Sequence, residues 1–228
     1  MTPIFPFKRD TWYPLGEFAR FEDDLLTARR QDDELDHALR LGKESWMKLR
    51  NEELYPLLYF ARHLGATADV SFKIGVEGAD TDVELRTGPQ QPRRLQITTA
   101  GPLWTGENNW GRDHKLHMAK LNAEGSVSGT VPFRREKDGS ISNREEAIST
   151  EERNPPYLAG LVQALRGEEQ HRVPNCELLV YANTYCELMS REDFLGLARE
   201  ALAAVPLVGF DAVHIFDSPD GYIVSMSR

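Results

Sequence analysis

Cysteine is almost missing from this 228-residue chain, which has only Cys176 and Cys186. Two cysteines at this spacing argue against a zinc ribbon and against a C-x-x-C redox pair. Cys176 opens an apolar run, and we expect a buried, inert thiol there. Long hydrophobic runs are also missing, since none approaches the roughly 18 residues that span a bilayer. The first residues lack the layout of a signal peptide. We therefore expect a cytoplasmic protein with no membrane partner.

Several signature motifs do not occur. The chain has no G-x-G-x-x-G, P-loop, G-x-S-x-G or H-E-x-x-H pattern, so dinucleotide, NTPase, esterase and zincin functions lack their usual signals. An excess of positive charge is missing too: 27 basic residues face 36 acidic ones, for a net charge of −9. This balance argues against a protein held on nucleic acid by bulk charge, but a local basic groove stays open.

The first quarter of the chain has helical periodicity. Residues 15–64 carry apolar side chains at helical spacing, with Gly42 as an end or bend and Pro56 as a kink or break. The length suits one large domain or a domain with a helical extension. We divide it into an N-terminal helical extension (1–43) and an α/β domain (44–228).

The apolar period then changes from helix to strand. Residues 70–76, 81–87 and 93–100 alternate apolar with polar side chains, and a Gly-Pro turn between the last two predicts a hairpin. A helix is expected over 108–125, an irregular segment over 126–155, and a helix after Pro155 and Pro156. A buried strand over 176–184, a helix capped by Ser190 and a final hairpin follow. These elements predict an α/β fold with a mixed central sheet flanked by helices.

The predicted hairpin places polar side chains on one face. Residues two apart in a strand share a face, so Asp82 and Glu84 point one way, and Gln96 and Thr98 share a face of the partner strand. A carboxylate beside an amide oxygen suits Mg²⁺, which can activate water at a phosphate. The alternative is an ordinary solvent-exposed sheet face. We expect Asp82 at the exposed end of its strand.

The order of these elements resembles the core of the PD-(D/E)XK, or restriction-endonuclease-like, nuclease superfamily. The resemblance covers roughly residues 44–182 and rests on LRNEELYPLLYFARHLG, GADTDVEL and RRLQITTAG. It implies a metal site made by Glu53 (or Glu52), Asp82 and Gln96, holding Mg²⁺ with Mn²⁺ as a substitute.

The motifs depart from the family pattern at three positions. Thr81 replaces the proline before the aspartate, Gln96 replaces the acidic residue of the second motif, and Thr98 replaces its lysine. Threonine supplies no positive charge to orient a nucleophile. Lys73, on the polar face of the preceding strand, is a candidate replacement, and an exposed lysine is the alternative.

The segment after the Gln-x-Thr strand holds the most basic predicted helix. Arg112, His114, Lys115 and Lys120 lie in it, and such a helix can contact phosphates or be an ordinary solvated face. We expect a divergent metal-dependent phosphodiesterase, an endonuclease acting on DNA. The alternative is a catalytically inactive nuclease-like scaffold that binds a protein or nucleic-acid partner, which Thr98 and the net charge favour.

Overall fold

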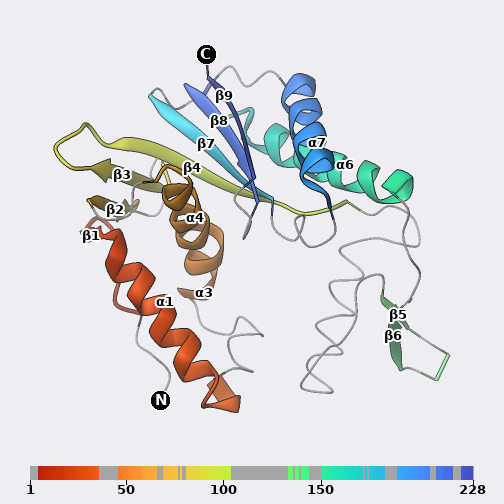
Figure 1. The fold of residues 1–228 in the computed structure, drawn as a ribbon, viewed down its shortest axis with the longest axis horizontal. Coiled ribbons are helices and arrows are strands. Elements are labelled where there is room, and N and C mark those ends of the chain that lie inside the picture. The colour runs from red at the N-terminus through yellow and green to blue at the C-terminus, as the bar shows by residue number, and fades with distance from the viewer. Residues whose placement is uncertain are drawn as a thin grey trace.

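A seven-stranded mixed sheet organises the chain in the computed structural model (Figure 1). The structure describes residues 5–35, 46–65, 69–76, 78, 81–103, 133–135, 137–138, 140–143, 150–171, 173, 175–182, 189–205, 209–217 and 222–227. The strands follow the spatial order β1 (Trp12–Pro14), β2 (Val70–Ile74), β3 (Val83–Thr87), β4 (Arg93–Ala100), β7 (Cys176–Ala182), β8 (Ala212–Phe216) and β9 (Ile223–Ser227). A separate hairpin joins β5 (Phe133–Arg135) to β6 (Ile141–Asn143).

The two halves of the sheet have different topology. The pairs β1–β2, β2–β3 and β3–β4 are antiparallel. The pairs β4–β7 and β7–β8 are parallel, and β9 pairs antiparallel with β8. The parallel connection from β4 to β7 passes through α6 (Thr150–Glu168), and the one from β7 to β8 passes through α7 (Arg191–Ala204). Each parallel step thus includes the helical crossover that such a connection requires.

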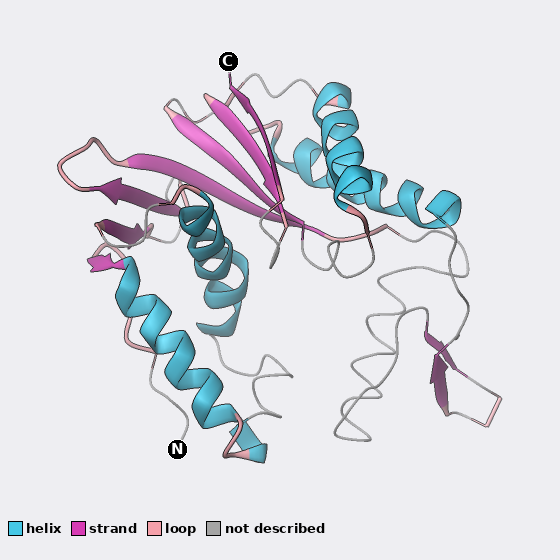
Figure 2. Ribbon diagram, viewed as in Figure 1, coloured by secondary structure: helices cyan, strands magenta, loops and turns pink. Residues whose placement is uncertain are grey.

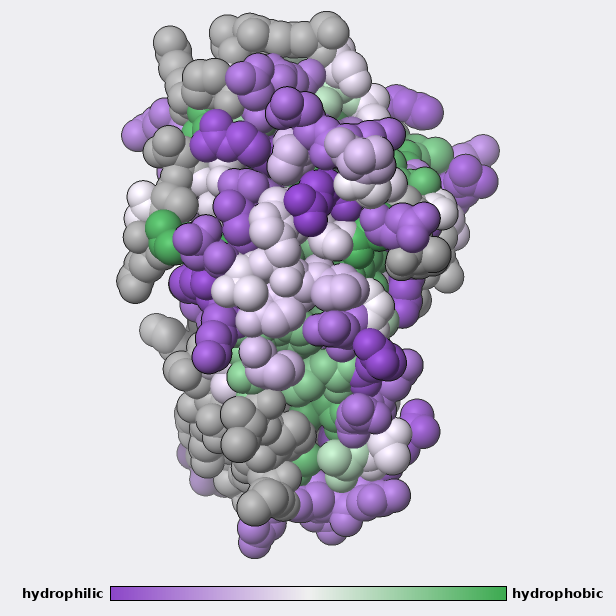
Figure 3. Space-filling view, turned by 90° about the vertical axis from the view of Figure 1, so that its left-hand side faces the viewer, coloured by the Kyte–Doolittle hydropathy of each residue, from purple (hydrophilic) through white to green (hydrophobic). Residues whose placement is uncertain are grey.

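Helices cover both faces of the sheet (Figures 1 and 2). On one face lie α1 (Leu15–Arg29) and a continuous helical run made of α3 (Trp46–Leu49), the π-helical turn η1 (Arg50–Leu54) and α4 (Tyr55–His63). On the other face lie α6 and α7. Figure 3 shows the side of the molecule on which β1, β2 and β3 lie, and the upper part of this surface is mainly hydrophilic.

Strand alternation divides the apolar side chains between two cores. Leu95, Ile97 and Leu179 pack with α1 and α4, whereas Cys176 and Leu178 pack with α6 and α7. The register pairs Leu95 with Glu177 and Gln96 with Leu178, so neighbours on β4 and β7 share a face. Gln96 and Thr98 therefore lie on the α6 face.

Several expectations are confirmed. The fold is α/β with a mixed sheet between helices, and the three alternating segments form β2, β3 and β4. The buried strand is β7, and the final hairpin is β8–β9. Ser190 caps α7 by accepting the Asp193 N–H at 3.2 Å. Cys176 is fully buried, and burial raises the pKa of its thiol to about 11.

Two details differ from expectation. The helix predicted after the prolines already begins at Thr150 and includes Pro155 and Pro156. Each proline removes one N–H donor, but the carbonyls affected lie near the exposed start of the helix, where water can bond them. Strand β1 was not predicted, and it joins the N-terminal segment to the sheet through β2.

Other expectations fall outside the described residues. The boundary after residue 43 and the helix over 108–125 lie there. The segment over 126–155, which we expected to be irregular, contains β5, β6 and the start of α6 among its described residues. In the described part of the chain, no helix is both long enough and apolar enough to cross a membrane.

Candidate active site at the start of strand β3

The β3–β4 ladder ends before β4 does, and the candidate site lies at this end. The ladder closes at the Val83–Leu95 pair, whereas β4 continues to Ala100. Asp82 lies just beyond the ladder and bonds the residues on either side of Gln96. The Asp82 N–H bonds the Leu95 carbonyl at 3.1 Å, and the Ile97 N–H donates to Asp82 Oδ2 at 2.7 Å. The carboxylate therefore takes the place of a backbone acceptor where β3 begins.

Gly75 holds Asp82 from the side of β2. Its N–H donates to the Asp82 carbonyl at 2.7 Å, and its own carbonyl accepts from Arg9 Nη1 at 2.6 Å. A Cβ at Gly75 would lie 2.2 Å from the Thr81 carbonyl oxygen, which leaves no room for a side chain. The end of β2 and the start of β3 are thus fixed by backbone contacts that only glycine permits.

Asp82 is half-buried, and it differs in this from the exposed strand end that we expected. Burial raises the pKa of its carboxyl group, and three contacts oppose the rise: the Ile97 N–H, Arg9 and His171. Removing the carboxylate would leave the Ile97 N–H without its acceptor, so Asn is a better replacement than Ala for testing its chemistry.

Glu53 approaches the same point from the other chain segment that the sequence singled out. It lies in η1, a π-helical turn. Such turns are rare in proteins, and those that occur are often found at functional sites. Arg50 anchors η1 to α1: its Nε lies 2.7 Å from Glu22 Oε1 and its Nη2 lies 2.5 Å from Oε2. Glu52, the alternative ligand, is exposed and pairs with Lys48 at 3.8 Å. The geometry therefore favours Glu53 over Glu52.

Glu53 has the most perturbed carboxyl group of the site. Burial, and then the nearby Asp82 carboxylate, raise its pKa to about 7. Its Oε2 atom is buried and has no hydrogen-bond partner among the residues that the structure describes. An unpartnered buried carboxylate oxygen is costly and is typical of a place where a water, proton or ion belongs.

Glu168, at the end of α6, is an acidic neighbour that the sequence did not point to. Burial raises the pKa of its carboxyl group, and Asp82 adds to the rise, whereas His171 and a hydrogen bond with Thr98 lower it. Its buried Oε2 also lacks a partner within the described ranges. Thr98, at the family's lysine position, is thus engaged with an acid. The only sequence feature that could have pointed to Glu168 is its place at the charged end of a helix that precedes a buried strand.

The predicted Lys73 lies on the sheet but is directed elsewhere. Its Nζ is 3.2 Å from Glu84 Oε1 and 3.5 Å from Asp10 Oδ1. The groups that lower the pKa of the Asp82 carboxyl are the Ile97 N–H, Arg9 and His171, and Lys73 is not among them. Of the predicted site residues, the structure therefore brings Glu53, Asp82, Gln96 and Thr98 to one end of β3. The predicted phosphate contacts Arg112, His114, Lys115 and Lys120 lie outside the described residues.

The residues at this end offer oxygen donors to a hard cation. Glu53, Asp82 and Gln96 supply two carboxylates and an amide, and Mg²⁺ is commonly bound through one or two carboxylates while it keeps several waters. Glu53 Oε2, which is buried and has no partner in the described part of the chain, fits such a role. Across the described ranges, no three His, Cys, Asp or Glu side chains are grouped to hold one ion. A cation here would therefore depend on the amide or on water for its remaining ligands.

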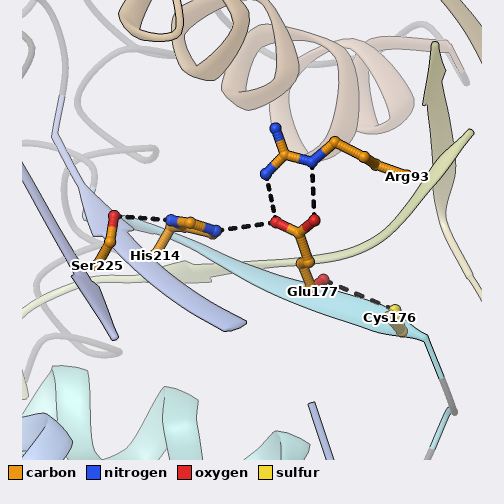
Figure 4. Close-up of polar contacts among 5 residues, drawn as sticks. All are labelled: Arg93, Cys176, Glu177, His214 and Ser225. Carbon is orange, nitrogen blue, oxygen red and sulfur yellow. Dashed lines mark hydrogen bonds and ion pairs between the residues drawn. The ribbon is translucent and has the colours of Figure 1, made fainter. Parts of the chain in front are cut away.

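A second polar cluster lies on the α4 face and has a structural character (Figure 4). Arg93 makes a two-pronged ion pair with Glu177, whose Oε2 is 2.9 Å from His214 Nε2, and His214 Nδ1 is 2.8 Å from Ser225 Oγ. Burial alone would raise the pKa of Glu177, but His214 and Arg93 outweigh it and lower the pKa to about 2. The cluster links β4, β7, β8 and β9 beneath Phe60, whose ring centroid is 4.9 Å from that of His214.

Comparison of the chain with protein-family models, with curated proteins and with solved structures finds no match.

Proposed function

We propose that the chain is a divergent metal-dependent phosphodiesterase that acts on DNA. The observation that carries the proposal is the approach of Glu53 and Asp82. They come from a π-helical turn and a strand start, and they lie close enough for Asp82 to raise the pKa of Glu53. Two carboxylates held together at the expense of stability are typical of a functional site.

The element order supports a restriction-endonuclease-like core. A helical run bearing Glu53 precedes three antiparallel strands, β2, β3 and β4, and a helix then leads to β7, which is parallel to β4. Asp82 starts the second of these strands and Gln96 lies on the third.

The residues of the site have separate roles in the proposed reaction. Asp82, held by Ile97 and Gly75, and Glu53 and Gln96 would hold the cation. A Mg²⁺ or Mn²⁺ ion at this place supplies an activated water and neutralises charge on the phosphate. Arg9 brings positive charge toward Asp82, at a site where Thr98 stands in place of the lysine of the nuclease motif.

Cleavage of plasmid and single-stranded DNA in Mg²⁺ and in Mn²⁺ tests the proposal, with wild type beside Asp82→Asn. Asn keeps an acceptor for the Ile97 N–H but removes the anionic ligand, so we expect cleavage to fall by more than about a hundredfold. Asp24→Asn, at an exposed position of α1, is the matched control and should cleave like wild type.

Thr98→Lys is the complementary arm, because it restores the family's residue beside Glu168. We expect faster cleavage, whereas Thr87→Lys at the far end of β3 should have no effect. Equal activity in wild type and Asp82→Asn would place the activity elsewhere. No cleavage by any variant, Thr98→Lys included, would favour the inactive scaffold that binds a partner.

A further inference from the structure

A cleft opens beside the candidate site, between the second half of β4 and α6. Its volume is about 320 Å³, and its lining includes Thr98, Gly101, Gly160, Gln163, Gly167 and Glu168. Three of the lining residues are glycines, which leave space open in the cleft. An ideal Cβ on Gly167 or on Gly101 would meet no atom within 4 Å.

The cleft is continuous with the carboxylates at the start of β3. Thr98 and Glu168 line it, and both belong to the site described above. The Asp82 carboxylate and His171 act electrostatically on Glu168. A molecule in the cleft would therefore have one end within reach of the Asp82 region.

The walls offer hydrogen bonds at one edge and apolar surface elsewhere. Gln163 is exposed and carries both a donor and an acceptor, and Glu168 has a buried oxygen that no described residue bonds. Gly160, Ala164 and Leu103 supply apolar surface. A flat ring with polar atoms along one edge matches this combination.

We propose that the cleft takes one unpaired nucleotide of the DNA strand whose phosphate lies at Asp82, so that the substrate is single-stranded or locally opened DNA. This inference rests on the proposed phosphodiesterase function. The volume is near the lower limit of small-molecule pockets, which are roughly 300–1,000 Å³. A cleft near this limit suits a single nucleotide better than a base pair. A base enters a site of this kind from a single strand, or from a duplex only by leaving its stack.

Filling the cleft tests the inference. Gly167→Leu places a side chain in the open space, and Gly196→Leu makes the same change at an exposed position of α7 that is equally free of neighbours within 4 Å. Both changes favour helix, so both variants should melt no lower than wild type. Gly101→Val, which fills the cleft from the residue after β4, serves if Gly167→Leu does not fold.

Binding is measured without metal, so that no strand is cut. The probes are a fluorescent single-stranded 12-mer and the duplex of the same sequence, titrated by anisotropy in EDTA at low salt. We expect wild type and Gly196→Leu to bind the single strand about tenfold more tightly than the duplex. Gly167→Leu should lose that preference while its duplex binding stays unchanged.

The outcomes separate this inference from the proposed function. If Asp82→Asn abolishes cleavage but Gly167→Leu prefers single strands as wild type does, the cleft assignment is overturned and the phosphodiesterase stands. Equal binding of both probes by wild type also overturns it. If the preference is present and is lost in Gly167→Leu, the cleft assignment is supported, even where wild type cuts neither probe in Mg²⁺.

Discussion

Glu53 binds its proton more tightly in the folded chain than it would in an unfolded one. Its pKa is about 7, against an ordinary value of 4.5, because burial and Asp82 both disfavour the carboxylate. The folded state therefore gains stability from Glu53 below about pH 4.5, and this gain is lost as the pH rises through 7. Above pH 7 the residue destabilises the fold.

Glu53→Gln should thus stabilise the protein at pH 8 in EDTA, by about 2 kcal/mol after allowance for partial exposure. The difference should shrink to near zero at pH 4, below the ordinary pKa of 4.5, where Glu53 is largely protonated in both the folded and the unfolded state. Urea denaturation at the two pH values measures it. Glu52→Gln, at the exposed neighbour, should change stability by less than about 0.5 kcal/mol at either pH. A Glu53→Gln variant no more stable than wild type at pH 8 would contradict the assigned burial.

Local pattern explains which site residues could be predicted. Asp82 and Gln96 follow from strand alternation and from a short hairpin, both of which are visible within twenty residues of sequence. Arg9, Glu168 and His171 reach the site only through the packing of the N-terminal segment and of α6 on the sheet. No local spacing encodes such contacts, so the sequence did not indicate these three residues.

At the scale of elements, the junction between β2 and β3 depends on close backbone contact. Gly75→Ala would bring a methyl group onto the Thr81 carbonyl, and the chain would have to move Asp82 to relieve the clash. We expect a loss of about 1–3 kcal/mol in the free energy of unfolding, together with loss of metal-dependent cleavage. Gly16→Ala, at an exposed and open position of α1, should be neutral or stabilising.

Denaturant melts and the DNA cleavage assay together check this prediction. The idea fails if Gly75→Ala is as stable and as active as Gly16→Ala. In the sequence, Gly75 appears only as a glycine on the polar face of the strand expected over 70–76. Alternation predicted the strand itself, but the close approach of Thr81 depends on how the chain returns between β2 and β3, and no periodicity encodes that path.

At the scale of the whole molecule, one ion-pair cluster joins four strands to a helix. Glu177 receives Arg93 from β4 and His214 from β8, and Ser225 of β9 completes the row (Figure 4). Its pKa of about 2 lies below the ordinary 4.5, so its contribution to stability is present above pH 4.5. That contribution is lost as the pH falls from 4.5 toward 2.

Glu177→Gln should lower the free energy of unfolding by about 2 kcal/mol at pH 7, because it leaves Arg93 without its counter-ion in a half-buried place. The deficit relative to wild type should narrow at pH 3, as the wild-type carboxylate loses its advantage. Thermal melts at pH 7 and pH 3 measure both. Glu200→Gln, exposed on α7, is the control. A deficit that is constant across this range would show that packing and not charge is responsible.

The position of β4 between the two halves of the sheet also sets an order of assembly. The β2–β3–β4 meander closes through short turns, whereas the partners Arg93 and Glu177 are separated by 84 residues along the chain. Contacts of such long sequence separation require a large loss of loop entropy before they form, and they slow folding. The Asp82 side of the site can therefore form early with the meander. We expect Glu168 to join it later, when β7 docks on β4, so that the site and its cleft are completed late in folding.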